Sequence, residues 1–163
     1  MIAWAISYCA DKSIIPLHAS TITDGRGRYN LFTNPGTYTL VAYRARYSPV
    51  MGCAVSLIEG QTAEGYDFSL TSALTGTVSG NVIIAGADWD QYATISFRQS
   101  VDCGGIETQI EIKSLNVIRS GFYSVELPVG SYDVVASTSG KASIIFNNVE
   151  VKAGLKTNLP INM

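Results

Sequence analysis

Few residues of this chain have the types and spacing that catalysis or metal binding requires. His18 is the only histidine, so neither a histidine-rich metal site nor a Ser-His-Asp arrangement is expected, and we interpret it as a solvated or capping residue of a loop. Two pairs of acids flank short loops, Asp88 with Asp90 and Asp102 with Glu107. Paired acids can bind Ca²⁺, but these lack an Asp-x-Asp-x-Asp-Gly run. We therefore predict no catalytic residue, no metal site and no cofactor.

Aromatic side chains offer a different kind of site, because exposed rings can stack on sugar rings. The candidates are Trp89, Tyr92, Tyr43 and Tyr47. Trp89 and Tyr92 lie three residues apart beside a predicted loop, and we name them as the ligand-stacking pair. The alternative interpretation is that most tyrosines occupy core positions of strands.

The three cysteines leave two interpretations open. Cys9 and Cys53 lie in the same half of the chain and could form a disulfide in an oxidising compartment. Free, half-buried thiols are the alternative. Cys103 has no partner in its own half.

Composition excludes several functional classes. Charged residues make up 15% of the 163 residues, and the net charge is −2, so no basic face for nucleic acid is expected. No apolar run has the length of about 18 residues that a membrane-spanning helix needs. The first ten residues are apolar but carry no basic segment of the kind that begins a signal peptide.

A 16-residue stretch occurs twice. Residues 27–42 read GRYNLFTNPGTYTLVA, and residues 121–136 read GFYSVELPVGSYDVVA. The offset is 94 (121 minus 27), and it persists downstream, where Val55 matches Val149. The chain therefore holds two copies of one structural unit.

Each copy contains two runs in which apolar residues alternate with period 2, which is typical of half-buried strands. Proline and glycine between the runs predict a tight turn, so we expect each copy to form a β-hairpin. Further strands are expected at residues 2–9, 20–23, 53–58, 65–70, 76–84, 92–98, 107–113, 143–151 and 155–163, with a loop at 12–18. The predicted fold class is all-β.

The repeated pattern resembles the carboxypeptidase regulatory-like domain. The resemblance is carried by Thr23, Asp24, Gly27, Tyr29, Leu31, Pro35, Gly36, Tyr38, Leu40 and Ala42, and in the second copy by Gly121, Tyr123, Val125, Gly130, Tyr132, Val134 and Ala136. The second copy lacks the Thr-Asp turn. The resemblance implies two tandem transthyretin-like, Greek-key-like β-sandwiches, related in shape to the B repeats of collagen adhesins. It also implies non-catalytic modules of secreted or surface proteins.

Collagen-adhesin relatives can carry Lys-Asn isopeptide crosslinks. The lysines of this chain flank predicted turns or point outward from predicted strands, so we interpret them as solvated charges. They are Lys12, Lys113, Lys141, Lys152 and Lys156.

We place the domains at residues 1–71 and 72–163. The second domain opens with a strand at residues 76–84, whose counterpart would precede Met1, so the first domain lacks its opening strand. Either the chain is a piece of a longer one, or another chain supplies the strand, as in donor-strand assembly. Leu155, Leu159 and Ile161 form an alternating tail that is a candidate donor, although we favour it as the last strand of its own domain.

These observations predict a non-catalytic, extracellular or cell-surface module with a structural or adhesive role in protein–protein assembly. Its partners would be other protein chains, including copies of itself in a filament completed by strand donation. The alternative is a carbohydrate-binding accessory module of a larger secreted protein.

Overall fold

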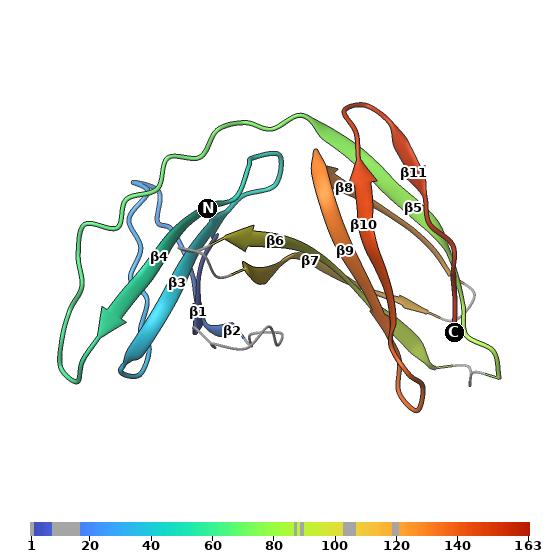
Figure 1. Cartoon of the computed structure of the whole chain (residues 1–163), viewed down its shortest axis with the longest axis horizontal. Coiled ribbons are helices and arrows are strands. Elements are labelled where there is room, and N and C mark those ends of the chain that lie inside the picture. Colours follow the sequence, from blue (N-terminus) through green and yellow to red (C-terminus); the bar gives the residue numbers. More distant parts are fainter. Residues whose placement is uncertain (1, 8–16, 87, 89, 103–106, 119–120) are drawn as a thin grey trace. The chain divides into compact units, whose positions relative to one another are not determined.

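The computed structural model describes residues 2–7, 17–86, 88, 90–102, 107–118 and 121–163. Twelve strands lie in these ranges, and no helix occurs among them, so the predicted all-β class is confirmed (Figure 1). The strands are β1 (Ile2–Ser7), β2 (Leu17–Ile22), β3 (Gly36–Tyr43), β4 (Val50–Leu57), β5 (Thr75–Ile83), β6 (Tyr92–Asp102), β7 (Glu107–Ile118), β8 (Phe122–Pro128), β9 (Gly130–Ser137), β10 (Ile144–Val151), β11 (Lys156–Asn158) and β12 (Ile161–Asn162).

The chain divides into two compact units. Unit 1 comprises residues 1–72 together with 101–109, and unit 2 comprises residues 73–100 and 110–163. The sequence-based division at residue 71 into separate folding domains stays a prediction.

Unit 2 is a β-sandwich-like unit of two sheets. One sheet has the order β10-β9-β6-β7, and in the other β5 pairs with β8 on one side and with β11 and β12 on the other (Figure 1). Phe97 of β6 and Tyr123 of β8 pack together, with ring centroids 6.4 Å apart. The alternating residues of both sheets form the buried core, which includes Val78, Val82, Ile95, Phe97, Tyr123, Leu127, Tyr132, Val134 and Ile161.

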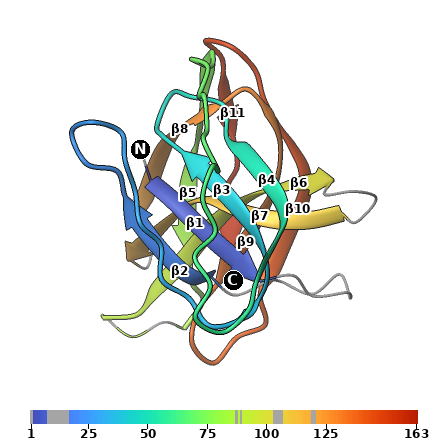
Figure 2. The same cartoon turned by 90° about the vertical axis from the view of Figure 1, so that its left-hand side faces the viewer.

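Unit 1 contains one four-stranded sheet, in the order β2-β1-β3-β4 (Figure 2). This is the order β7-β6-β9-β10 of unit 2, as the 94-residue offset predicts for β3 with β9 and for β4 with β10. The buried tyrosine at the start of each repeated strand makes the same contact. The Tyr38 hydroxyl donates to the Asn34 carbonyl at 2.6 Å, and the Tyr132 hydroxyl donates to the Pro128 carbonyl at 2.8 Å.

The predicted hairpin is wrong in both copies. In unit 2 the turn at Val129 does not join two paired strands, because β8 pairs with β5 while β9 pairs with β6 and β10. The turn therefore leads from one sheet to the other. In unit 1, residues 28–35 belong to no strand, and neither do residues 61–71, so the strand predicted at 65–70 is also wrong. Period-2 alternation places side chains on alternate faces but does not supply a partner for the backbone.

Candidate functional site

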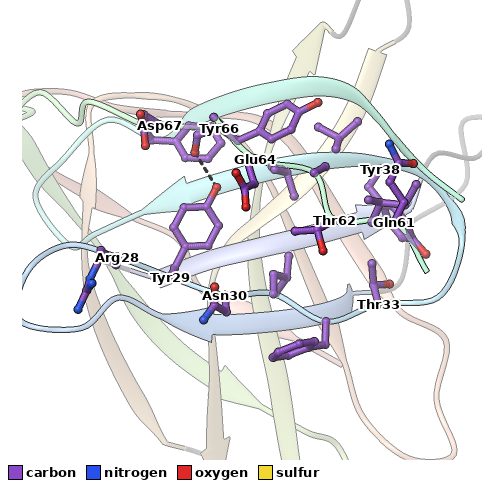
Figure 3. Close-up of a pocket in the computed structure, with 18 of the residues that line it drawn as sticks. Arg28, Tyr29, Asn30, Thr33, Tyr38, Gln61, Thr62, Glu64, Tyr66 and Asp67 are labelled. Carbon is purple, nitrogen blue, oxygen red and sulfur yellow. Dashed lines mark hydrogen bonds between the residues drawn. The ribbon is translucent and has the colours of Figure 1, made fainter. Parts of the chain in front are cut away.

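A groove of about 770 Å³ lies on one face of the unit 1 sheet (Figure 3). Its floor is made by Tyr38 and Leu40 of β3 with Val55 and Leu57 of β4. Its walls are the two segments without strand structure, residues 26–33 and 61–68. All of its lining residues belong to unit 1.

The apolar side chains around the groove are incompletely covered. Tyr38, Leu40 and Val55 are buried, whereas Leu31 and Phe68, which pack against them, remain partly exposed. Tyr29 is also partly exposed, with its ring centroid 6.3 Å from that of Phe68. Unit 1 therefore has a shallow core with apolar side chains open at its edge.

The equivalent side chains of unit 2 are buried. Val125 is the counterpart of Leu31 by the 94-residue offset and is 7% exposed. Ile161 is fully buried, and it corresponds to Phe68 when Leu159 is aligned with Tyr66, since each of these two carbonyls accepts from the equivalent tyrosine hydroxyl. The difference follows from β5, which lies between β8 and the pair β11 and β12 and covers these residues. No described strand of unit 1 takes that position, and the groove lies there instead.

A hydrogen bond joins the two walls of the groove, and an equivalent hydrogen bond is present in unit 2. The Tyr29 hydroxyl donates to the Tyr66 carbonyl at 2.7 Å, and the Tyr123 hydroxyl donates to the Leu159 carbonyl at 2.6 Å (Figure 3). Burial raises the pKa of Tyr29, with smaller contributions from the charge of Asp67 and from Tyr66, and burial alone raises the pKa of Tyr123 to about 12. Residues 26–33 and 61–68 are thus joined as the corresponding segments of unit 2 are, although no described strand of unit 1 takes the position of β5.

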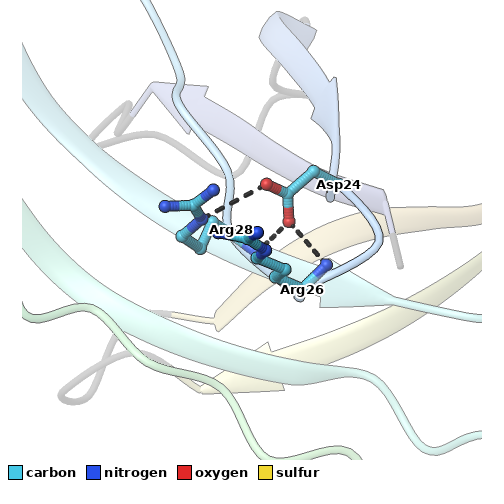
Figure 4. Close-up of polar contacts among 3 residues, drawn as sticks. All are labelled: Asp24, Arg26 and Arg28. Atoms are coloured by element: carbon cyan, nitrogen blue, oxygen red, sulfur yellow. Dashed lines mark hydrogen bonds and ion pairs between the residues drawn. The ribbon is translucent and has the colours of Figure 1, made fainter.

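A tight turn leads into the first wall (Figure 4). The Asp24 carboxylate accepts from the backbone N–H groups of Arg26 and Arg28, both at 2.9 Å, and the Arg28 Nε donates to its second oxygen at 3.2 Å. The Arg28 backbone bond is the largest cause of a lowered pKa at Asp24, followed by the Arg26 backbone bond. This is the Thr-Asp turn that the sequence singled out, and it orients residues 26–33.

The possible metal-ligating side chains of the described residues are scattered over the structure. No group of three His, Cys, Asp or Glu side chains comes together among them. His18 lies within β2 and not in the predicted loop, since β2 begins one residue before it. Asp88 and Asp90 are exposed, and the side chains of Asp102 and Glu107 lie outside the described residues.

The predicted disulfide and the predicted ligand-stacking pair each include a residue outside the described part of the chain. Cys9, Cys103 and Trp89 lie outside the described residues, and of Cys53 only the backbone in β4 is described. The Cys9–Cys53 disulfide therefore stays a prediction. Tyr92 is 52% exposed at the start of β6, and its pairing with Trp89 likewise stays a prediction.

Tyr43 and Tyr47 differ from the exposed rings that the sequence suggested. Tyr43 is buried in β3, where burial raises its pKa, so it cannot present a face to a sugar. Tyr47 is half-buried, and the Arg44 guanidinium lies 5.1 Å from its ring centroid. The prediction that Tyr43 is an exposed stacking residue is wrong, because β3 has six consecutive buried residues.

The alternating tail occupies a place in its own unit. β11 and β12 run parallel to β5, pairing Thr157 with Val78 and Ile161 with Val82. Ile161 is fully buried, Leu159 is partly exposed and Leu155 is 59% exposed. Exchange of this tail between chains stays a prediction.

Two of the lysines have neighbours in the structure. Lys152 lies 3.0 Å from Glu150, and Lys156 lies 5.7 Å from the centroid of the Phe122 ring.

No residue of the groove was among the site residues predicted from the sequence, although the sequence does indicate incomplete covering of the first core. The strand predicted at residues 76–84 has no predicted counterpart after Met1, and together with the core phase of Tyr29, Leu31 and Phe68 this predicts an uncovered core. That combination indicates an incompletely covered core, but it does not specify that residues 26–33 and 61–68 form the walls of a groove.

No helix in the described part of the chain is long and apolar enough to cross a membrane. Comparison of the chain with family models, with curated proteins and with solved structures finds no match. The resemblance to the carboxypeptidase regulatory-like domain therefore stays a prediction, and the site must be interpreted from its own geometry.

Proposed function

We propose that this chain is a non-catalytic structural module for protein–protein assembly, and that unit 1 binds an extended strand of a partner polypeptide in its groove. The observation that carries the proposal is the comparison between the two units. The side chains that β5 buries in unit 2 have counterparts in unit 1 that are partly exposed along a groove at the same position.

The proposed partner is a strand because the groove of unit 1 lies at the position that β5 occupies in unit 2. Residues 28–33 and 61–68 lie on its two sides, as β8 lies on one side of β5 and β11 and β12 on the other. An added strand can form main-chain hydrogen bonds to both sides. It would also cover Leu31 and Phe68, and full burial of a large apolar side chain contributes about 1.5–3 kcal/mol.

We assign the donor strand to a different polypeptide because the candidate donor strands of unit 2 are already paired within their own unit. β5 is paired on both sides, and the tail is paired with β5. Donation by a second copy would require one of these strands to leave its own core. An extracellular or cell-surface location and an adhesive role belong to this proposal through the family resemblance.

The test uses the 163-residue chain and a synthetic peptide of residues 74–85, which contains β5. Light scattering behind size exclusion should give 17.5 kDa for the chain alone, and calorimetry should show one bound peptide per chain. A peptide in which Val78 and Val82 are replaced by Asp should not bind, because buried charges are costly.

Two chain variants show whether the peptide enters the groove. Leu31→Glu places a charge inside the groove and should abolish binding. Phe32→Glu is the matched control, because Phe32 is 87% exposed and its counterpart in β8 is Glu126. Binding that survives Leu31→Glu, or no binding to the unmodified chain, would overturn the proposal. A chain that polymerises without peptide would identify a second copy as the donor and overturn the assignment to a separate partner.

A further inference from the structure

Two glycines of β5 face main chain at very short range. A Cβ atom on Gly80 would collide with the Leu159 carbonyl oxygen and would lie 2.6 Å from the Leu159 carbonyl carbon and 3.1 Å from the Pro160 nitrogen. A Cβ on Gly76 would collide with the Lys152 carbonyl oxygen. Because the obstacles are backbone atoms, no side-chain rotation can make room.

The first obstacle has a counterpart in unit 1. The Leu159 carbonyl is held by the Tyr123 hydroxyl, and Gly80 lies opposite Tyr123 in the β5–β8 register. The Tyr66 carbonyl is held by the Tyr29 hydroxyl in the same way. A strand residue opposite Tyr29 would therefore face the Tyr66 carbonyl.

The second obstacle also has a counterpart. The Lys152 carbonyl accepts from the Leu155 N–H at 3.1 Å, and the Ile58 carbonyl accepts from the Gln61 N–H at 3.1 Å. Ile58 and Gln61 lie 94 positions before Lys152 and Leu155, so the two hydrogen bonds are equivalent. Gly76 lies opposite Leu127, whose counterpart is Thr33. A strand residue opposite Thr33 would therefore face the Ile58 carbonyl.

We infer that the groove selects donor strands of the pattern Gly-x-Val-x-Gly-x-Val, or one with other β-branched residues in place of valine. The second glycine lies opposite Tyr29, and the first valine lies opposite Leu31. The strand runs antiparallel to residues 28–33 and parallel to residues 61–68, as β5 runs relative to β8 and to β11 and β12. This inference rests on the proposed function and names the class of partner that the same groove takes.

The glycines make the pattern selective. The β-branched residues supply apolar burial that many strands could supply, whereas the glycines exclude nearly every strand that lacks them. The position between the second glycine and the second valine carries Asn81 in β5 and is exposed, so it should tolerate larger residues.

The experiment measures the affinity of four peptides of residues 74–85 for the 163-residue chain by calorimetry. Gly80→Val should bind at least about tenfold more weakly than the native peptide, because overpacking against fixed atoms is destabilising. Asn81→Val is the matched control, since it adds the same side chain on the exposed face, and its affinity should stay within about threefold. Gly76→Val places the same side chain at the first glycine, opposite the counterpart of the Lys152 carbonyl, and should also bind at least about tenfold more weakly than the native peptide.

The outcomes separate this inference from the proposed function. If the native peptide does not bind, the proposed function fails and takes the inference with it. If the native and Gly80→Val peptides bind equally, strand binding stands and the glycine requirement is overturned. If the native and Gly76→Val peptides bind equally, the requirement for the first glycine is overturned. Binding of the native peptide must also be lost in the Leu31→Glu chain, since otherwise the peptide is replacing β5 of unit 2.

Discussion

The most informative single residue of each unit is the tyrosine whose hydroxyl donates to a distant carbonyl, Tyr29 to that of Tyr66 and Tyr123 to that of Leu159. Tyr123 is 3% exposed, and its hydroxyl donates to the Leu159 carbonyl. Its ionised form would lose this bond and would place a charge in the core. Burial therefore raises the pKa of Tyr123 to about 12, above its ordinary value of 10.

This pKa predicts how unit 2 responds to alkali. Below pH 10 the tyrosine is neutral in both folded and unfolded chains, so the contribution to stability is fully present. Above pH 10 the unfolded chain loses the proton first, and stability falls as the pH rises toward about 12. Denaturant unfolding followed at several pH values should show this fall. Tyr123→Phe should be less stable at neutral pH by about 1 kcal/mol and should show a smaller alkaline loss. An unchanged alkaline loss in Tyr123→Phe would contradict the assignment.

The lowered pKa of Asp24 predicts that the turn at residues 24–28 weakens in acid. This pKa is held below the ordinary 3.8, chiefly by the backbone N–H of Arg28 and then by that of Arg26. The turn is therefore strengthened above the ordinary pKa and weakened as the pH falls through the lowered value. A carbon-detected NMR titration of the Asp24 carboxyl group should give a midpoint below 3.8.

The Arg28→Ala variant is the control for this titration. It keeps the backbone N–H and removes only the guanidinium, which is the smallest of the causes that lower the pKa. Most of the lowering should persist in the variant. A midpoint that returned to the ordinary value would show that the ion pair, and not the turn, controls this carboxylate.

At the scale of elements, β5 is the strand on which unit 2 depends. Gly80→Ala would place a Cβ against the Leu159 main chain, and either β5 or the tail would have to move. We expect a loss of about 1–3 kcal/mol in the free energy of unfolding of unit 2. Asn81→Ala, on the exposed face of the same strand, should change it by less than about 0.5 kcal/mol. Urea unfolding of both variants checks the prediction, which would be wrong if their stabilities were equal.

The strands predicted correctly from the sequence are those that pair with another described strand. The alternation of Tyr132, Val134 and Ala136 predicts β9, and the structure pairs β9 on both sides. Tyr29 and Leu31 have the same alternation, yet no strand forms at residues 28–35, because no described strand lies where β5 pairs with β8. The pattern of side chains was the same, and the presence of a backbone partner made the difference.

For the whole molecule, the contrast between the units predicts unequal resistance to opening. Unit 2 has two sheets with a continuous buried core, whereas unit 1 has one described sheet with partly exposed side chains at its edge. Local stability follows buried apolar contact. Hydrogen exchange should therefore be faster in β3 than in its counterpart β9. The peptide of residues 74–85 should slow exchange in β3 and leave β9 unchanged. Equal protection of β3 and β9 in the free chain would contradict the asymmetry.

The sequence by itself determined the all-β class, the two copies of one unit and the face of each repeated strand that enters a core. These properties follow from local patterns, because side-chain period and turn residues act over a few neighbouring positions. It also predicted an opening strand at residues 76–84, and no described strand of unit 1 corresponds to it. Only the tertiary structure decided that β8 and β9 belong to different sheets, that the walls of unit 1 are not strands and that a groove lies between them. Those outcomes depend on which backbones meet across long stretches of sequence, and no local pattern specifies such a meeting.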